Sequence, residues 1–260
     1  MRSLADAYSA GAQAWAGGPQ RIYGTLADLL VASSPLDLRG CRVLDLGTGT
    51  GAASRPAVAA GAGVVAIDAA LGMLQFDRAS RPPGIVGDAL ALPLRPRSFD
   101  AVVAAFSLNH LHEPATAVRE IAGVIRKAGL LLASVYANDD DHPVKRAAEQ
   151  AMSEAGWQPP DWYPAVKRSM QAWGTVADVT NAIERGGLRA ESVERREIAF
   201  PDLGPDALVG WRLGMAQFTS FVGTLDGQQR RAVHARCRDL LGDDPDPLVR
   251  RVIFISARAC

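Results

Sequence analysis

A chain of 260 residues, 48% of them apolar, can bury the core of one large α/β domain, alone or with a small insertion. Its 28 basic and 28 acidic residues balance, which argues against a general binder of nucleic acid or of an anionic membrane. The three cysteines are scattered, so we expect neither a metal site nor a disulfide framework.

The beginning of the chain shows no export signal. Residues 1–16 contain no basic segment followed by an unbroken apolar run, so we expect no signal peptide. No stretch reaches the roughly 18 uninterrupted apolar residues of a transmembrane helix. We therefore expect a cytoplasmic protein without a membrane partner.

Residues 1–34 are expected to form a helical cap ahead of the sheet. Apolar residues recur at helical spacing between Gln20 and Ala32, which predicts an amphipathic helix packed on the sheet edge. The preceding segment is rich in Gly and Ala but carries Tyr8 and Trp15. These two aromatic residues either pack the first helix or cover a ligand.

The rest of the chain is organised around a strand followed by a glycine-rich turn. The apolar run Cys41–Leu46 leads into glycines at alternate positions, Gly47, Gly49 and Gly51, and the Ala-rich segment 52–60 follows. Glycine permits a tight turn and lets a ligand approach the backbone, and the first N–H groups of the next helix face that ligand. This pattern predicts the first βα unit of a nucleotide-type fold, with its ligand at the carboxyl end of the strand.

The position of Asp45 indicates which ligand this turn binds. Gly47, Gly49 and Ala52 also satisfy the dinucleotide pattern G-x-G-x-x-G/A, but a carboxylate at Asp45 would repel a pyrophosphate and attract an ammonium group. S-adenosylmethionine (SAM) carries an ammonium, a sulfonium and no phosphate. Asp45 therefore favours SAM over NAD, and Gly47, Thr48 and Gly49 become candidate cofactor contacts.

At this turn the sequence resembles the class I SAM-dependent methyltransferases, whose first motif is an acidic residue followed by G-x-G-x-G. The resemblance implies that the region of Tyr8 and Trp15 folds over the cofactor, with the ring face of one of them covering the sulfonium. It also implies that Asp88 and Ala89, after the short strand that begins at Gly84, contact the adenine. The alternative for Asp88 is an exposed turn residue.

The second predicted strand, Gly63–Asp68, also ends in an acid. Asp68 follows the glycine turn by about twenty residues, the spacing at which an acidic residue reaches ribose hydroxyls. Residues 69–78 are predicted to be helical, beginning at Ala69. Met73 on that helix faces either the adenine edge or the core.

The segment from Ser98 to Leu111 carries the second part of the resemblance. The run Phe99–Phe106 is predicted to be a central strand, preceded by S-F-D and followed by Asn109, His110 and His112. Ubiquinone and menaquinone C-methyltransferases show the same arrangement, which implies that this strand ends beside the reactive methyl. His110 is our candidate general base, and its alternative role is to cap a helix or orient a loop.

Beyond Tyr136 the sequence predicts the parts that hold an acceptor. The acidic run 138–142 favours a helix start over a cation site. Prolines interrupt the aromatic residues of segment 154–173, which predicts an irregular lid. A helix over 176–186 and a strand over 189–200 follow. The insertion 201–247, with helices over 206–224 and 228–241, precedes a last strand at 249–257 and is expected to build the acceptor pocket or a dimer contact.

Together the strands up to Tyr136 and the helices between them predict an α/β fold with a doubly wound, Rossmann-like parallel sheet. The resemblance implies that a final strand pair completes a sheet of seven strands, mostly parallel with an antiparallel final strand, and we expect a helical cap and insertions around it. We expect a cap at 1–34, a SAM-binding core at 35–138, and at 139–260 the rest of the sheet with a lid (154–175) and an insertion (201–247). The expected cofactor contacts are Asp45, Gly47, Thr48, Gly49, Asp68, Ala69, Met73, Asp88, Ala89, Phe106 and Tyr8. The expected substrate contacts are Trp15, Asn109, His112, Trp162, Tyr163, Trp211 and Met215.

The predicted function is transfer of a methyl group from SAM to an O, N or C nucleophile by in-line displacement, leaving S-adenosylhomocysteine (SAH). The aromatic residues of the lid favour a small, largely apolar acceptor such as a quinone, polyketide or terpenoid, bound by a monomer or homodimer without nucleic acid. One alternative is a methyltransferase-like protein that binds SAM but catalyses a cyclisation or acts non-catalytically. The other, an NAD-dependent oxidoreductase, is disfavoured by Asp45.

Overall fold

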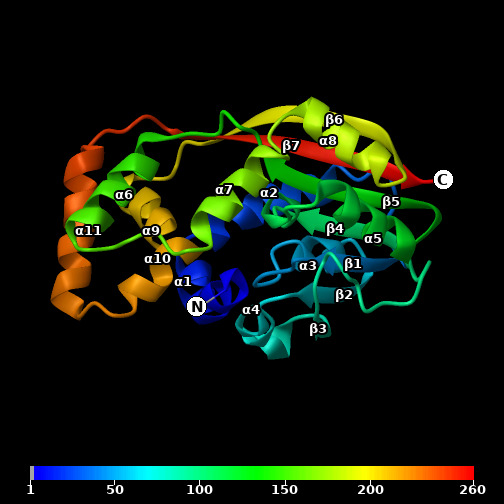
Figure 1. Ribbon diagram of the computed structural model, residues 1–260, viewed down its shortest axis with the longest axis horizontal. Helices are drawn as coiled ribbons and strands as arrows, with labels where there is room; N and C mark the ends of the chain where they lie inside the picture. Colours follow the sequence, from blue (N-terminus) through cyan, green and yellow to red (C-terminus); the bar gives the residue numbers. More distant parts are fainter. Residues whose placement is uncertain (1–2) are drawn as a thin grey trace.

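The computed structural model describes residues 3–260, and a single seven-stranded sheet forms its centre (Figure 1). The strand order is β3-β2-β1-β4-β5-β7-β6. β1 to β5 run parallel, and β7 runs antiparallel to both β5 and β6. The strands are β1 Arg42–Leu46, β2 Gly63–Asp68, β3 Gly84–Val86, β4 Phe99–Ala105, β5 Ile125–Tyr136, β6 Leu188–Phe200 and β7 Leu248–Ala259. This topology confirms the predicted mostly parallel, seven-stranded, doubly wound sheet with an antiparallel final strand.

Helices cover both faces of the sheet. They are α1 Leu4–Gly17, α2 Gln20–Ala32, α3 Ser54–Ala59, α4 Leu71–Gln75, α5 Pro114–Val124, α6 Pro143–Glu154, α7 Tyr163–Gln171, α8 Val176–Arg185, α9 Pro205–Leu213, α10 Ala216–Val222 and α11 Gly227–Leu241. Single 3-10 turns occur at Arg78–Ser80 and Leu108–His110. None of the described helices is long and apolar enough to cross a membrane.

Alternating side chains divide the core into two clusters, one on each face of the sheet. Successive residues of a strand point to opposite faces, so neighbours in sequence enter different clusters. In β1, Val43 packs with α2 and α3, whereas Leu44 packs with α5 and α8. Both residues are fully buried. Apolar residues at consecutive positions of a strand, such as Val43 and Leu44, are therefore covered by helices on both sides of the sheet.

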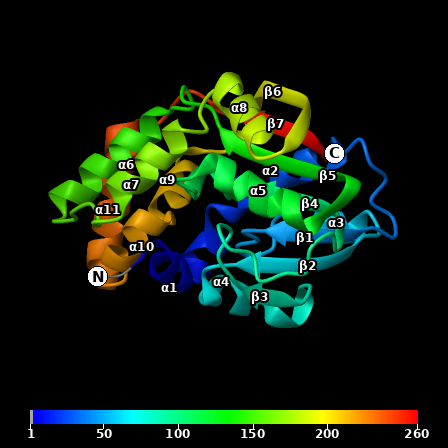
Figure 2. The same cartoon turned by 45° about the vertical axis from the view of Figure 1, so that its right-hand side comes forward.

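The helices α6, α9, α10 and α11 gather beyond one end of the sheet, with α1 beside them, and the turned view keeps this group together (Figures 1 and 2). α1 packs on α10, and α6 packs on α9 and α11. This helical group stands at the end of the sheet where β4 and β5 finish. The insertion between β6 and β7 thus contributes helices to the same region as the N-terminal helix.

The segment predicted to be an irregular lid is irregular over residues 155–162 but contains a regular helix. α6 continues to Glu154, and Tyr163–Gln171 is a regular helix whose proline occupies the first turn. Proline is tolerated there because its missing N–H has no partner within the helix. Trp157 and Trp173 are core residues, 4% and 0% exposed. Their indole N–H groups donate to the carbonyls of Gln217 and Leu111, at 3.0 and 3.1 Å.

Two predicted helices are shorter than expected. The helix predicted over 69–78 is only Leu71–Gln75, because Phe76 adopts an extended backbone conformation. The helix predicted over 206–224 breaks into α9 and α10, where Met215 is extended and Gly214 closes the first part. The helix predicted over Gln20–Ala32 is confirmed at both ends.

Candidate active site

Two adjoining cavities lie at the carboxyl ends of the central strands. The glycine-turn cavity, about 210 Å³, is lined by residues that directly follow β1, β2, β3 and β4. The helical cavity, about 400 Å³, is lined by residues from α6, α7, α9 and α10. Leu4, Tyr8, Tyr23 and His110 line both. The two cavities therefore meet at a small set of mainly aromatic side chains.

The glycine turn needs its glycines for two separate reasons. Gly47 and Gly49 have φ of 67° and 53°, a left-handed conformation that side chains disfavour. Gly47 is also too close to the next strand connection for a side chain, because a Cβ there would lie 2.3 Å from Cβ of Ser107. A Cβ at Gly49 would meet no atom within 4 Å, so bare backbone faces the cavity at this position.

Asp68 ties the end of β2 to this turn. Its Oδ2 accepts from the N–H of Gly49 and its Oδ1 from the N–H of Ala70, both at 2.8 Å. The side chain lines the glycine-turn cavity, as does Asp88, an exposed residue at the rim. No lysine or arginine is among the described residues that line this cavity. Arg81 donates to the Gly49 carbonyl at 3.0 Å but does not line the cavity. Two carboxylates in a lining without a cation favour a positively charged ligand and oppose a pyrophosphate.

Asp45 does not line either cavity, which corrects the prediction that it faces the ligand. Its carboxylate is buried beneath the turn, where Oδ2 accepts from Oγ1 of Thr48 at 2.7 Å and from Oγ of Ser54 at 2.5 Å. Burial raises its pKa, although these hydrogen bonds and the nearby Arg81 act in the opposite direction. Asp45 therefore supports the glycine turn from beneath, because its side chain points away from the cavity.

Tyr8 and His110 form the boundary between the cavities. The Tyr8 hydroxyl lies 3.2 Å from Nε2 of His110, and their rings meet edge to face. Burial lowers the pKa of His110 to about 4, so the imidazole is neutral at pH 7. Its Nδ1 is buried and has no hydrogen-bond partner in the described chain. His110 thus keeps one ring nitrogen available at the point where the cavities join.

α1 is held over the glycine-turn cavity by a close helix contact. A Cβ at Gly72 of α4 would lie 2.2 Å from the carbonyl oxygen of Ser9, so only glycine permits this approach. The N–H of Gly72 also donates to Oγ of Ser9 at 3.2 Å. This contact fixes the helix that carries Tyr8, which is the residue before Ser9.

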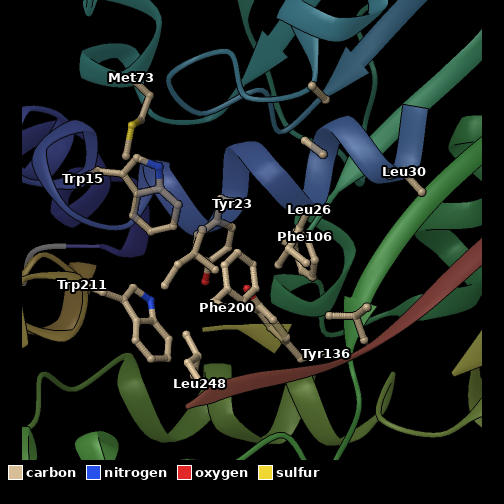
Figure 3. Close-up of a cluster of buried hydrophobic side chains, with 14 of the residues drawn as sticks. Trp15, Tyr23, Leu26, Leu30, Met73, Phe106, Tyr136, Phe200, Trp211 and Leu248 are labelled. Carbon is tan, nitrogen blue, oxygen red and sulfur yellow. The ribbon is translucent and has the colours of Figure 1, made fainter. Parts of the chain in front are cut away.

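A chain of aromatic rings continues from α1 into the sheet (Figure 3). Trp15 packs on Tyr23 with centroids 4.6 Å apart, and Tyr23 meets Phe106 edge to face at 5.4 Å. Phe106 stacks on Tyr136 at 4.5 Å. Phe106 has φ of 57°, which is uncommon for a residue with a side chain and places its ring at the cavity wall. Tyr23 is the ring of this chain that lines both cavities.

The helical cavity has a mixed lining, which departs from the expected largely apolar pocket. Aromatic side chains line part of it: Tyr23, Tyr136, Trp162 and Tyr163. Charged side chains line the rest: Asp140, Asp141, Lys145, Arg146, Glu149, Lys167 and Arg212. Asp140 forms a buried pair with Arg250, at 2.8 Å, and a second pair with Lys145, at 2.9 Å.

Most sequence-predicted contacts line one of these cavities. Those at the glycine-turn cavity are Gly47, Thr48, Gly49, Asp68, Ala69, Met73, Asp88, Ala89, Phe106, Tyr8 and Trp15. Those at the helical cavity are Asn109, Trp162, Tyr163 and Met215, and His110 lines both. Trp15 was expected at the substrate and lies at the other cavity.

Two predicted substrate contacts line neither cavity. His112 is 70% exposed and pairs with Glu113 at 3.3 Å. Trp211 is buried at 1% exposure, behind the guanidinium of Arg250, 4.7 Å from the centre of its ring. A helix places consecutive residues about 100° apart. The residue after Trp211, Arg212, therefore lines the cavity instead.

Several cavity residues escaped the sequence analysis. Tyr136 had a usable signal, because it ends a predicted central strand, where ligands bind in this class of sheet. Asp140 was read as part of a helix start. The helix does begin at Pro143, but Nδ1 of His142 caps it by accepting from the N–H of Val144, which leaves Asp140 to pair with Arg250. Arg212 gave no local signal, because its role depends on a helix in the insertion.

Comparison with known proteins agrees with this geometry. The model of a family described as "Methyltransferase domain" matches residues 44–133. A demethylmenaquinone methyltransferase of Mycolicibacterium vanbaalenii is 31% identical over 177 residues, which cover 65% of this chain and 76% of that protein. The chain belongs to the class I SAM-dependent methyltransferases. Its match to the corresponding enzyme of Renibacterium salmoninarum, 36% identical, covers 52% of this chain and only 60% of the relative.

The likeness in fold to a solved structure extends over nearly all of the chain. A protein from Haloferax volcanii, solved in complex with the methyltransferase activator Trm112, superposes with a TM-score of 0.59 at 20% identity. That match covers 99% of this chain and 96% of the other. The likeness includes the helical group in fold alone, because identity is low. The part matched by the family model, in contrast, contains the glycine turn and ends before the helical cavity's own helices.

Proposed function

We propose that the protein transfers a methyl group from SAM, held in the glycine-turn cavity, to a small molecule held in the helical cavity. The observation that carries this proposal is that the two cavities meet at Tyr8, Tyr23 and His110. Two ligands placed on either side of these residues would be adjacent. Alignment of two reactants in a site that excludes water lowers the barrier of a displacement reaction.

The lining of the glycine-turn cavity fits SAM. Asp68 and Asp88 are the only charged residues among the described lining residues, so a sulfonium and an ammonium are favoured. Bare backbone at Gly49 and the aromatic ring of Tyr8 complete a surface for an adenosine and a charged sulfur. SAM, when bound, supplies an electrophilic methyl group. The same lining disfavours NAD, whose pyrophosphate would face two carboxylates without a cation.

His110 is the residue we propose for proton transfer. Its imidazole is neutral at pH 7 and is next to both cavities, so it can accept a proton from an O–H or N–H nucleophile. The Tyr8 hydroxyl donates to Nε2 of His110 or accepts from it, depending on the tautomer, and thereby orients the ring. A carbon nucleophile of a phenolic or enolic acceptor would use the same base.

The acceptor we propose is an aromatic small molecule. The relatives are named for demethylmenaquinone, a quinone, and the aromatic side chains of the helical cavity suit a ring of that kind. However, α6, α7, α9 and α10 follow the segment 44–133 that the family model matches. These helices therefore select the acceptor in this chain. The charged side chains that they place in the helical cavity decide which substituents the ring of the acceptor carries.

Calorimetric titration with SAH and with NADH tests the cofactor. We expect micromolar binding of SAH and none of NADH, and binding of NADH alone would contradict the proposal. A second step incubates the protein with SAM and a panel of phenols, quinones and aromatic acids, and detects methylated product by mass spectrometry. SAH binding with a rearranged product and no added methyl group would favour the cyclisation alternative.

A further inference from the structure

Arg212 is a buried cation without a carboxylate partner. It lies near the end of α9, is 6% exposed and lines the helical cavity. No ion pair joins it to any carboxylate within residues 3–260, and its Nε has no hydrogen-bond partner there. Burying an unpaired charge is costly, so such a group persists in a fold mainly where a ligand supplies the opposite charge.

The carboxylates around Arg212 are committed to other cations. Asp140 pairs with Arg250 and Lys145, and Asp141 pairs with Arg146 at 2.7 Å. Glu149 faces Arg212 from α6, but its carboxylate is 38% exposed, accepts from Oη of Tyr163 at 3.1 Å and has Lys167 at 3.8 Å. No protein group therefore neutralises Arg212 directly.

The buried cluster next to the cavity carries excess positive charge. Asp140 is its only carboxylate, and Lys145, Arg250 and Arg212 are its cations. Burial is the largest influence on the pKa of Arg212 and lowers it; the charge of Arg250 also lowers it, while Tyr163, Tyr23 and Glu149 act in the opposite direction. The end of α9 offers its carbonyls, equivalent to roughly half a negative charge, which offsets only part of this excess.

The geometry points to a carboxylate on the acceptor, bound by Arg212 beside the aromatic wall of the helical cavity. This inference rests on the proposed function, since it names the class of molecule that receives the methyl group: an aromatic carboxylic acid. Arginine suits this role because its planar guanidinium donates two parallel hydrogen bonds to a carboxylate. A phosphate dianion fits less well, because Asp140 and Glu149 line the same cavity and oppose a second negative charge.

Three probes of the same ring size and different charge test the inference: 1-naphthoate, 1-naphthamide and 1-naphthyl phosphate. Their affinities are measured by calorimetry with and without saturating SAH. For the wild type we expect naphthoate to bind about tenfold or more tightly than naphthamide, the contribution of a charged hydrogen-bonded pair. Arg212→Gln should bring the two affinities within about twofold, the remainder left by weaker neutral hydrogen bonds.

A matched control separates contact from long-range charge. Arg168→Gln removes the same charge from an exposed position of α7 outside the cavity and should keep the preference for naphthoate. Absence of any naphthoate binding by the wild type, an equal affinity for the amide, or an unchanged preference in Arg212→Gln would each overturn the inference. Tighter binding of the phosphate than of the carboxylate would also overturn it.

Two further measurements separate ligand binding by Arg212 from a role in folding, and separate this inference from the proposed function. Arg212→Met should melt no lower than the wild type, because it removes an unpaired buried charge. A drop of about 4 °C or more would instead make Arg212 a structural residue and would contradict the inference. Arg212→Gln should bind SAH as the wild type does. A wild type that binds naphthoate through Arg212 but not SAH would contradict the proposed function alone.

Discussion

The hydroxyl of Tyr8 lies 3.2 Å from Nε2 of His110, although 102 residues separate them in the chain. Tyr8 comes from α1, which covers the glycine-turn cavity, and His110 follows the central strand β4. Tyr8 therefore reaches His110, at the boundary between the two cavities, only when α1 is packed on α4. This docking depends on Gly72, whose missing side chain lets Ser9 approach α4.

The pH dependence of methyl transfer should reveal the buried state of His110. Because burial lowers the pKa of His110 to about 4, the ring stays neutral from pH 6 upward and is protonated only near pH 4. We expect kcat to be flat with respect to His110 between pH 6 and 8. A pH–rate profile of the wild type against His110→Asn checks this. An inflection near pH 6.5 that is absent from the variant would show that the ring is solvated during turnover.

Removing the Asp68 carboxylate should weaken SAH binding by tenfold or more. This group holds the N–H groups of Gly49 and Ala70 and faces the cavity, and hydrogen bonds to charged groups contribute about 1.5–3 kcal/mol. Calorimetric titration of Asp68→Asn and Asp68→Ala with SAH measures the loss. Asp141→Asn, which removes a carboxylate that does not line the glycine-turn cavity, is the control, and equal affinities in all these proteins would reject the site assignment.

Asp45→Ala should mainly lower the free energy of unfolding, because the Asp45 side chain does not line the cavity that holds the ligand. The carboxylate is buried and accepts from Thr48 and Ser54. Its removal leaves these two hydroxyls only each other as acceptors, at 3.2 Å, so one of the two loses its acceptor, at a cost of about 1–3 kcal/mol. Urea unfolding measures the decrease. A variant as stable as the wild type but unable to bind SAH would return Asp45 to the direct role that the sequence predicts.

A side chain at Gly47 should be poorly tolerated, in contrast to one at Gly123. Gly47→Ala forces an alanine to φ of 67° and places its Cβ against Ser107, so we expect a loss of more than about 1 kcal/mol. Gly123 lies in α5, where a Cβ would meet nothing within 4 Å, and Gly123→Ala should stabilise by about 0.4–1 kcal/mol. Thermal unfolding of both variants gives the comparison, and effects of the same sign would contradict it.

The pair of Asp140 and Arg250 should make stability fall at acidic pH. Burial alone would raise the pKa of Asp140, but Arg250 and Lys145 outweigh it and hold the pKa at about 2. Since this is below the ordinary value of about 3.9, the pair's contribution is present above pH 4 and is lost as the pH falls toward 2. The unfolding free energy of Asp140→Asn should therefore vary less than that of the wild type between pH 4 and pH 2.

At pH 7 the same variant tests how strongly the buried pair holds the helical cavity together. Leaving Arg250 buried without its partner should cost about 3–5 kcal/mol. Urea unfolding of Asp140→Asn at pH 7 measures this cost, with the exposed pair variant Asp141→Asn as the control. A change below about 1 kcal/mol, typical of exposed pairs, would show that Arg250 finds another acceptor.

Local patterns in the sequence by themselves determined the sheet and the glycine turn. A parallel strand buried on both faces is mostly apolar, and a left-handed turn favours glycine, so the residues alone predict β1, β2, β4 and the turn at Gly47. The carboxyl ends of neighbouring parallel strands meet at one edge, which is why the sequence places Asp68 and His110 near each other, and both line the glycine-turn cavity.

The tertiary structure decided which side chains face the cavities. The direction of a side chain in a helix depends on where that helix docks, and the helices of the insertion dock on α1 and α6, far from them in sequence. Trp211 thus enters the core while its neighbour Arg212 enters the cavity. Asp45 turns beneath the glycine turn because Thr48 and Ser54 meet its carboxylate there. Such choices come from packing between distant segments, which no local pattern records.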